Sequence, residues 1–299
     1  MDTIVFLQSF ATPWLDTMMT WVTDLGSEEA YIGLVVLVYL GIDARIGQRL
    51  GVLLLISFFV NQYAKGLFDT PRPFVADPEI VRTERALAGA LGAGFPSGHA
   101  QSSSTFWIYA AALAGSAWFW PVAVLIVALV SVSRLYLGVH MPLDIVGGLA
   151  IGLTLVLLAV LIDRSRVEIS RWLLAALAVA VPLSAHLLFP TPESDLLAGA
   201  LTALVLGPML LRHRTDGHVI GRIVVTIIGL VLVFTVLVAS SEMLPEEIKR
   251  DPYGGYARYL VLGLTGTLVA PWMGRVFGLV PQPPPRSRPR PRPLPQPWR

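Results

Sequence analysis

The sequence predicts an all-α fold, a polytopic bundle of transmembrane helices. Of its 299 residues, 55% are hydrophobic and only 14% are charged, whereas soluble domains carry about 25% charged residues. The mean hydropathy is +0.67, and the apolar residues are gathered in long runs. Because a helix needs about 20 mostly apolar residues to cross a bilayer, several runs are long enough once their small flanking residues are included.

Ten segments are candidate membrane spans. The first two are the weakest. Asp16 and Asp24 interrupt the first, and Trp14 and Trp21 are typical of interfacial anchors, so this segment is expected to lie partly in the membrane interface. The expected spans are 4–24, 29–43, 49–67, 98–117, 119–137, 142–162, 171–189, 195–211, 219–240 and 257–279.

The basic residues are divided unequally between the two ends of these spans. If ten spans alternate in direction, fourteen of the 22 lysines and arginines fall on the side of both termini and eight on the other side. The side richer in lysine and arginine is usually cytoplasmic. The sequence therefore predicts a multi-pass protein of the cell (inner) membrane with both termini in the cytoplasm.

The connections between the spans also carry signals. In the long connection 68–95, Asp77-Pro78-Glu79 reads as a helix N-cap, a proline at the first helical position and an acid in the first turn. This predicts a short amphipathic helix over 78–88. The proline- and arginine-rich residues 281–299 cannot pack a core and are expected to be disordered or polyproline II.

Three polar clusters fall at the ends of spans three to six that share one membrane face, away from the predicted termini. Although they are far apart in sequence, the topology brings them together, so we interpret them jointly. They are Lys65 to Arg72-Pro73, Pro96-Ser97-Gly98-His99, and Ser133-Arg134 followed by His140 and Asp144.

Lys65, Arg72 and Arg134 are cations at the ends of apolar helices. Three cations in one pocket repel one another unless an anion lies between them, and arginine matches the oxygens of phosphate in a bidentate fashion. Any one of them alone could equally extend to lipid headgroups as a generic interfacial cation. Three together beside two histidines favour a phosphate or pyrophosphate site.

Ser97, Gly98 and His99 precede the fourth span. The N-terminus of a helix offers unpaired N–H groups to an anion, and glycine lets the backbone approach a phosphate closely. Taken alone, this segment would be a plain N-cap with a flexible glycine. His99 could give a proton to a departing alkoxide or phosphate at neutral pH.

His140 and Asp144 flank Pro142 at the start of the sixth span. At this spacing a carboxylate can orient the imidazole and stabilise its cation, which leaves the other ring nitrogen as a nucleophile. The alternatives are a favourable first-turn acid for Asp144 and an interfacial histidine for His140.

Together, the three clusters resemble the three-part signature of the type 2 phosphatidic acid phosphatase superfamily, over about residues 30–165. The resemblance implies that His140 forms a phosphohistidine, that Asp144 orients it and that His99 is the general acid. It implies that Lys65, Arg72, Ser97, Gly98 and Arg134 bind phosphate, and that neither a metal nor another cofactor takes part. The expected domains are a six-helix phosphatase core (1–165), a C-terminal transmembrane module of about four helices (166–280) and the tail (281–299).

The function implied is that of an integral membrane phosphatase that hydrolyses a lipid phosphate monoester or pyrophosphate at the periplasmic or exterior face. Its expected partners are a lipid phosphate substrate and membrane lipids, with no nucleic acid. Undecaprenyl pyrophosphate hydrolysis and phosphate transfer between lipids fit the same pocket. A non-enzymatic lipid transporter is a further alternative, although binding alone does not need a His140–Asp144 pair. His213 and His218 are expected to be solvated in a cytoplasmic loop, and His186 to be packed or interfacial.

Overall fold

The computed structural model describes residues 1–90, 92–165, 170–188 and 194–281. All regular structure in these ranges is helical, which confirms the predicted all-α class. The N-terminal part comprises α1 (Asp2–Gln8), α2 (Pro13–Asp24), α3 (Glu28–Leu37), η1 (Val38–Ile42), α4 (Ala44–Phe68), α5 (Pro73–Ala76), η2 (Pro78–Ile80), α6 (Glu84–Ala88), α7 (Gly98–Ser103), η3 (Ser104–Ile108), α8 (Tyr109–Ala114), α9 (Phe119–Tyr136) and α10 (Pro142–Ser165).

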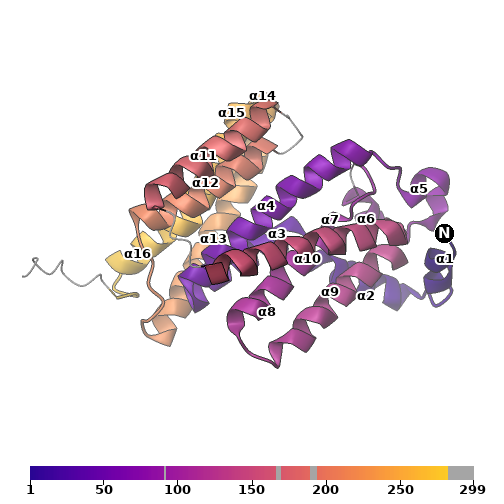
Figure 1. Cartoon of the computed structure of the whole chain (residues 1–299), viewed down its shortest axis with the longest axis horizontal. Coiled ribbons are helices and arrows are strands. Elements are labelled where there is room, and N and C mark those ends of the chain that lie inside the picture. Colours follow the sequence, from indigo (N-terminus) through magenta and orange to yellow (C-terminus); the bar gives the residue numbers. More distant parts are fainter. Residues whose placement is uncertain (91, 166–169, 189–193, 282–299) are drawn as a thin grey trace, which may run out of the picture.

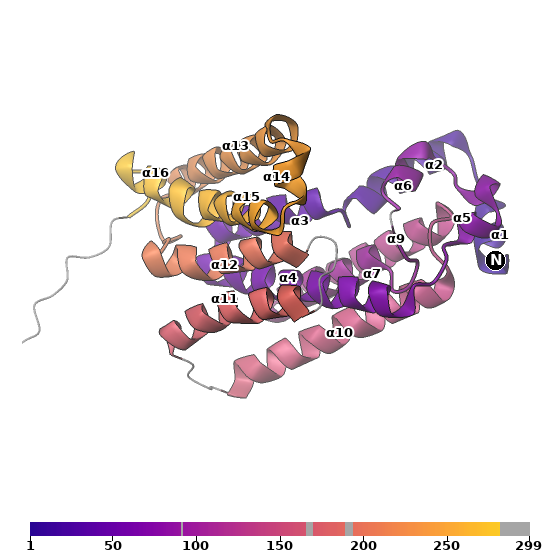
Figure 2. The same ribbon diagram turned by 90° about the horizontal axis from the view of Figure 1, so that it is seen from above.

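The C-terminal part packs beside α3 and α4. It comprises α11 (Arg171–Leu188), α12 (Ser194–Leu210), α13 (Val219–Met243), α14 (Glu246–Arg250), α15 (Pro252–Leu264), η4 (Thr265–Val269) and α16 (Ala270–Val276). In the views of Figure 1 and Figure 2, these helices lie on one side of the molecule and α2, α6 and α9 lie on the other.

The structure is that of an integral multi-pass membrane protein. Among the described residues, four helical segments are long and apolar enough to cross a membrane: Ala44–Ala76, Phe119–Tyr136, Pro142–Ser165 and Val219–Met243. The pair Pro13–Asp24 and Glu28–Ile42, bent by 53°, gives a fifth if it is taken as one span. Of the remaining expected spans, one is the shorter helix α12, and the runs from α7 to α8 and from α15 to α16 each contain a π-helical turn.

The expected first span, 4–24, is not one helix. α1 ends at Gln8, and α2 begins at Pro13, where the Thr12 side chain accepts a hydrogen bond from the Leu15 N–H. The Gln8 amide donates to the carbonyls of Ile80 (2.7 Å) and Tyr136 (2.8 Å), so α1 lies at the end of the bundle where α9 finishes. The N-terminus is therefore at the same end as the three polar clusters (Figure 1).

The C-terminal described residues lie at the opposite end, where Arg275 donates to the carbonyl of Arg212 in the loop after α12. The first and the last described residues thus lie at opposite ends of the molecule, whereas the membrane side of each terminus remains a prediction. The sequence carries no lysine or arginine before Arg45, so the charge bias could not orient the first segment. Hydropathy alone suggested a span there, and the break at Thr12-Pro13 prevents it.

The prediction of one amphipathic helix over 78–88 is also wrong. The structure has two short pieces there, η2 and α6. Asp77 caps the 3₁₀ turn η2, and Thr83 caps α6 by accepting from the Ala86 N–H. Between them, the Arg82 N–H donates to the carbonyl of Leu137, outside the segment. Two competing N-caps and one long-range backbone bond replace a continuous helix.

Glycines bring α7 and α10 into close contact. A Cβ added to Gly148 would lie 2.5 Å from the carbonyl oxygen of Ser97, and one added to Gly152 would collide with the Ser104 hydroxyl. Small residues at a helix–helix contact allow such close approach in membranes. This contact places the start of α7, which carries Ser97 and His99, against the start of α10, which carries Asp144.

Candidate active site

All three predicted clusters meet at one end of the bundle. Arg72 is the N-cap of α5, Ser97 is the N-cap of α7, and Arg134 lies in the last turn of α9. Asp144 lies in the first turn of α10, and Lys65 lies in the last turn of α4. Each side chain is therefore placed by a helix terminus, where the chain leaves unpaired backbone groups.

His140 and Asp144 form the predicted pair. The His140 Nδ1 is 3.2 Å from the Asp144 Oδ2, and His140 is only 1% exposed. The same carboxylate oxygen accepts a hydrogen bond of 2.8 Å from the Met141 N–H. Because an ionised carboxylate only accepts hydrogen bonds, this contact assigns the imidazole proton to Nδ1 and leaves the lone pair on Nε2.

Arg72 contacts the other ring nitrogen of the same histidine. Its Nη1 is 3.2 Å from the His140 Nε2 and donates to the Val139 carbonyl at 3.0 Å, while its Nε donates to the Gly92 carbonyl at 2.9 Å. Since a guanidinium can only donate, Nε2 is the acceptor here. Both neighbours of His140 thus require the same tautomer.

Arg134 is 2% exposed and carries a partly unsatisfied guanidinium. Its Nη1 donates to the Thr23 hydroxyl at 2.8 Å, whereas its Nε has no hydrogen-bond partner among the described residues. A buried charged donor without a partner is unfavourable, and an anion beside it would remove that cost. Thr23, in α2, was not predicted, because nothing in its sequence context marks it.

Ser97, Gly98 and His99 line the start of α7. Ser97 is fully buried, and its N–H donates to the carbonyl of Asp144 at 2.9 Å. A Cβ on Gly98 would lie 3.2 Å from the Asn61 Oδ1, so the backbone here is closely packed. Lys65 reaches the same loop by donating to the carbonyl of Ala93.

His99 is half-buried beneath the connection between α2 and α3. A Cβ added to Gly26, in that connection, would lie 2.9 Å from the His99 Cδ2 and from the Val130 side chain. Gly26 thus lets the chain pass directly over the imidazole. This role was missed by sequence reasoning, since Gly26 is far from the three clusters.

A buried polar network holds α4 against α7. The Asn61 amide donates to the Gln101 side chain at 2.9 Å, and the Gln101 amide donates to the Ser57 carbonyl at 2.7 Å. Ser57 in turn hydrogen-bonds Thr105 at 3.0 Å. The network fixes the relative position of the helices that carry Lys65 and His99.

The cations act on His140 electrostatically. Burial lowers its pKa well below the ordinary value, and the charges of Arg134, Arg72 and Lys65 lower that pKa further. All three predicted cations therefore act on the same imidazole. Because the pKa is lowered, His140 is neutral at neutral pH, which is the protonation state a nucleophile requires.

The remaining histidines differ from one another. His213 was expected to be solvated, but it is 4% exposed, and its Nε2 lies 3.0 Å from the carbonyl oxygen of Leu40. The loop 211–218 folds back onto η1 and buries it. His218 is exposed, as expected. The side chain of His186 and the tail from residue 282 lie outside the described residues.

Family models match two parts of the chain. The model described as "PAP2 superfamily" matches residues 47–168, and that described as "PAP2 superfamily phosphatase, transmembrane extension" matches residues 196–282. The first range ends three residues beyond the expected domain 1–165, and the second ends two residues beyond the expected domain 166–280. The domain boundaries remain a prediction.

Three relatives illustrate the similarity. Phosphatidylglycerophosphatase B of Bacillus subtilis is 30% identical over 48% of this chain and 72% of its own length. The undecaprenyl-diphosphatase of Sulfolobus acidocaldarius is 29% identical over 50% of this chain and 72% of its own. Mouse sphingosine-1-phosphate phosphatase 2 is 31% identical over 45% of this chain, but the match spans only 38% of that relative.

Among solved structures, a transmembrane PAP2-type phosphatidylglycerolphosphate phosphatase from Bacillus subtilis aligns with a TM-score of 0.48 and 23% identity. The alignment covers 56% of this chain and 86% of the other.

Proposed function

The chain belongs to the PAP2 superfamily, and from this premise we propose that it hydrolyses a lipid phosphate monoester or pyrophosphate through a phosphohistidine on His140. The observation that carries the proposal is the buried His140, whose Nδ1 faces Asp144 and whose Nε2 lone pair faces the cationic pocket. A site that only bound anions would need the cations but not this oriented imidazole.

The first step transfers the phosphoryl group to the enzyme. The His140 Nε2 attacks phosphorus, a P–N bond forms, and the bond from phosphorus to the leaving oxygen breaks. The bound phosphate anion favours the protonated form of His99, which gives its proton to that oxygen. Arg72 exchanges its contact with Nε2 for the phosphoryl oxygens, and Asp144 stabilises the positive imidazole.

The second step releases phosphate. A water attacks the phosphorus of the phosphohistidine, the P–N bond breaks, and His99 accepts a proton from the water. Lys65, Arg72 and Arg134, with Ser97 and the Gly98 N–H, hold the charge that develops on the phosphoryl oxygens. Residues of the chain supply the nucleophile, the acid and base and the phosphate-binding groups of both steps. The proposed reaction therefore uses neither a metal nor another cofactor.

We place the site at the periplasmic or exterior face of the cell membrane. By the sequence count, the side of Arg45, Arg49 and Arg164 has the larger share of the lysines and arginines, and such a side is usually cytoplasmic. At the site end, Arg82 and Arg85 form ion pairs with Asp16 and Asp24. The C-terminus is then cytoplasmic and the N-terminus lies on the same face as the site.

The proposed substrate class is a phosphate group carried on a membrane lipid. The names of the relatives specify sphingosine-1-phosphate, phosphatidylglycerophosphate and undecaprenyl diphosphate, which share a phosphate on a hydrocarbon anchor. Phosphate transfer to a second lipid would use the same first step, with a lipid hydroxyl in place of water.

A substrate panel tests the proposal. Phosphate release by the purified protein is measured in mixed micelles with a chelator present, on phosphatidic acid, phosphatidylglycerophosphate, undecaprenyl diphosphate and a soluble ester. We expect release from at least one lipid and inhibition by vanadate, which mimics the phosphoryl transition state. Strict dependence on an added divalent metal, or binding of all the lipids without phosphate release, would overturn it.

A further inference from the structure

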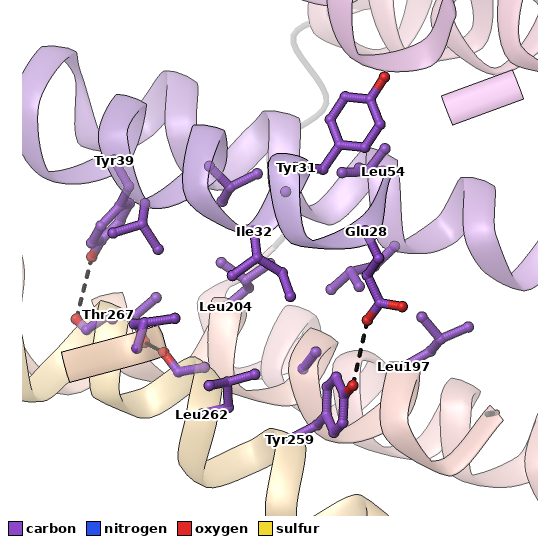
Figure 3. Close-up of a pocket in the computed structure, with 18 of the residues that line it drawn as sticks. Glu28, Tyr31, Ile32, Tyr39, Leu54, Leu197, Leu204, Tyr259, Leu262 and Thr267 are labelled. Atoms are coloured by element: carbon purple, nitrogen blue, oxygen red, sulfur yellow. Dashed lines mark hydrogen bonds between the residues drawn. The ribbon is translucent and has the colours of Figure 1, made fainter. Parts of the chain in front are cut away.

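An apolar cavity lies between the N-terminal part of the chain and its C-terminal extension. Its walls come from α3, η1 and α4 on one side and from α12, α13, α15 and η4 on the other, and its volume is about 100 Å³. Figure 3 shows Glu28 facing Tyr259 at one end and Tyr39 facing Thr267 at the other, with aliphatic side chains between them. The slot is apolar and is not enclosed, so it suits part of a hydrocarbon chain.

A second pocket, of about 700 Å³, opens at the end of the molecule opposite His140. It is lined by four arginines and two aspartates: Arg45, Arg212, Arg214, Arg275, Asp43 and Asp216. Asp216 pairs with Arg214, and Asp43 accepts hydrogen bonds from the backbone at the start of α4. The pocket is therefore net positive.

Arg45 and Arg212 are the most available cations of this pocket. Both are exposed, and neither side chain makes a hydrogen bond or an ion pair with another described residue. Burial and the charge of Arg275 both lower the pKa of the neighbouring His213. His213 therefore adds no charge near neutral pH. The positive charge is thus permanent and comes from arginine, which binds phosphate oxygens well.

The two spaces share one wall residue. Tyr39 lines both the apolar cavity and the basic pocket. Gln48, which lines the basic pocket, donates to the carbonyl of Leu204, which lines the apolar cavity. An anionic group in the basic pocket would therefore sit directly beneath a slot for a hydrocarbon chain.

We propose that the basic pocket and the apolar cavity together form one site, the seam, which binds one anionic phospholipid. Its phosphate lies at Arg45 and Arg212, and one hydrocarbon chain lies along α3 between Tyr39 and Glu28. The dimensions agree with a lipid of the leaflet opposite the active site. Eleven residues of helix from Glu28 to Tyr39 span about 16 Å, close to half of a hydrocarbon core of about 30 Å.

The seam is distinct from the active site. Gln48 and Lys65 are seventeen residues apart on α4, which is about 25 Å along the helix. Because the lipid touches both α3 and α12, it joins the N-terminal part of the chain to the extension. The extension thus forms half of a lipid site that the N-terminal part alone does not complete.

Native mass spectrometry of the purified full chain tests this proposal. Phosphatidylglycerol is the probe, since it is an anionic phosphodiester rather than a phosphate monoester, and phosphatidylcholine is the neutral comparison. We expect one phosphatidylglycerol to be retained in preference to phosphatidylcholine. Arg45→Gln and Arg212→Gln should each weaken binding about fivefold, whereas the control Arg164→Gln, exposed at the same end on α10, should leave it unchanged.

A second variant separates the headgroup from the chain. Ala200, on α12, lines the apolar cavity, and Ala200→Leu should weaken binding of a long-chain phosphatidylglycerol but not of a short-chain one. His140→Ala should retain the lipid. Equal retention of both lipid classes, displacement by inorganic phosphate alone, or loss of the lipid in His140→Ala would overturn the proposal.

Discussion

The two arginine-rich ends of this protein are built differently. At the active-site end, Arg72 and Arg134 are buried and held by carbonyl or hydroxyl acceptors from other parts of the chain. At the opposite end, Arg45 and Arg212 are exposed and have no such acceptors among the described residues. Donors held in place before the reaction need no reorganisation when charge develops, whereas exposed side chains adapt to whichever ligand arrives. We therefore assign chemistry to the first end and lipid retention to the second.

The largest expected effect is at His140, which only the active-site end possesses. His140→Ala removes the proposed nucleophile, so phosphate release should fall by on the order of 10⁴-fold. The measurement is release from the best lipid of the panel, with size-exclusion behaviour and thermal unfolding compared to exclude misfolding. His218→Ala, which changes an exposed histidine, is the matched control. Full activity in His140→Ala would remove the proposed mechanism.

The next effect compares the two kinds of arginine directly. Arg134→Gln takes away a buried donor and should lower kcat by about 10²- to 10³-fold. Arg45→Gln, at the opposite end, should leave kcat within about twofold. Steady-state kinetics on both variants check the contrast. If the two substitutions lowered kcat equally, the distinction between the ends would be lost.

The pH dependence sharpens the same comparison. Burial and the charges of Arg134, Arg72 and Lys65 depress the pKa of His140. The imidazole therefore stays neutral at pH values at which a free histidine would be protonated. The acid limb of kcat/KM should thus lie below the ordinary histidine pKa of about 6.5. Lys65→Gln removes one of these charges, so its acid limb should move to higher pH, whatever happens to the rate.

A shift of that limb to lower pH in Lys65→Gln, or no shift at all, would contradict this assignment. Lys249→Gln, in α14, serves as the control for a lost charge. Lys249 already pairs with Glu246, so its removal should not change the profile.

The smallest effect concerns the glycine over His99. Gly26→Ala puts a methyl group 2.9 Å from the imidazole of His99. Displacement of this proposed general acid should lower kcat about tenfold. Gly66→Ala is the control, since nothing lies within 4 Å of the Cβ that it adds. Activity of the two variants is measured side by side on one lipid. Equal activity would mean that His99 does not depend on this contact.

The sequence predicted most of the fold and all the polar clusters, because each was marked by a local signal. Helix positions followed from apolar runs, and the site followed from cations and histidines at helix ends on one face. Residues 4–24 and 78–88 were mispredicted where caps at Thr12 and Thr83 interrupt apolar or amphipathic stretches. Thr23 and Gly26 could not be found, since their roles arise only from the tertiary placement of α2 over His99 and Arg134.

The contact between Arg72 and the His140 Nε2 has a consequence for the proposed mechanism before substrate binds. The electron pair that would attack phosphorus faces the Arg72 guanidinium in this structure. In the proposed mechanism a ligand reacts only after the guanidinium has moved from Nε2 to the oxygens of the ligand. Binding of the ligand and release of the nucleophilic electron pair are then one event. An uncharged ester that enters the pocket would not draw Arg72 away from Nε2 and would not be hydrolysed.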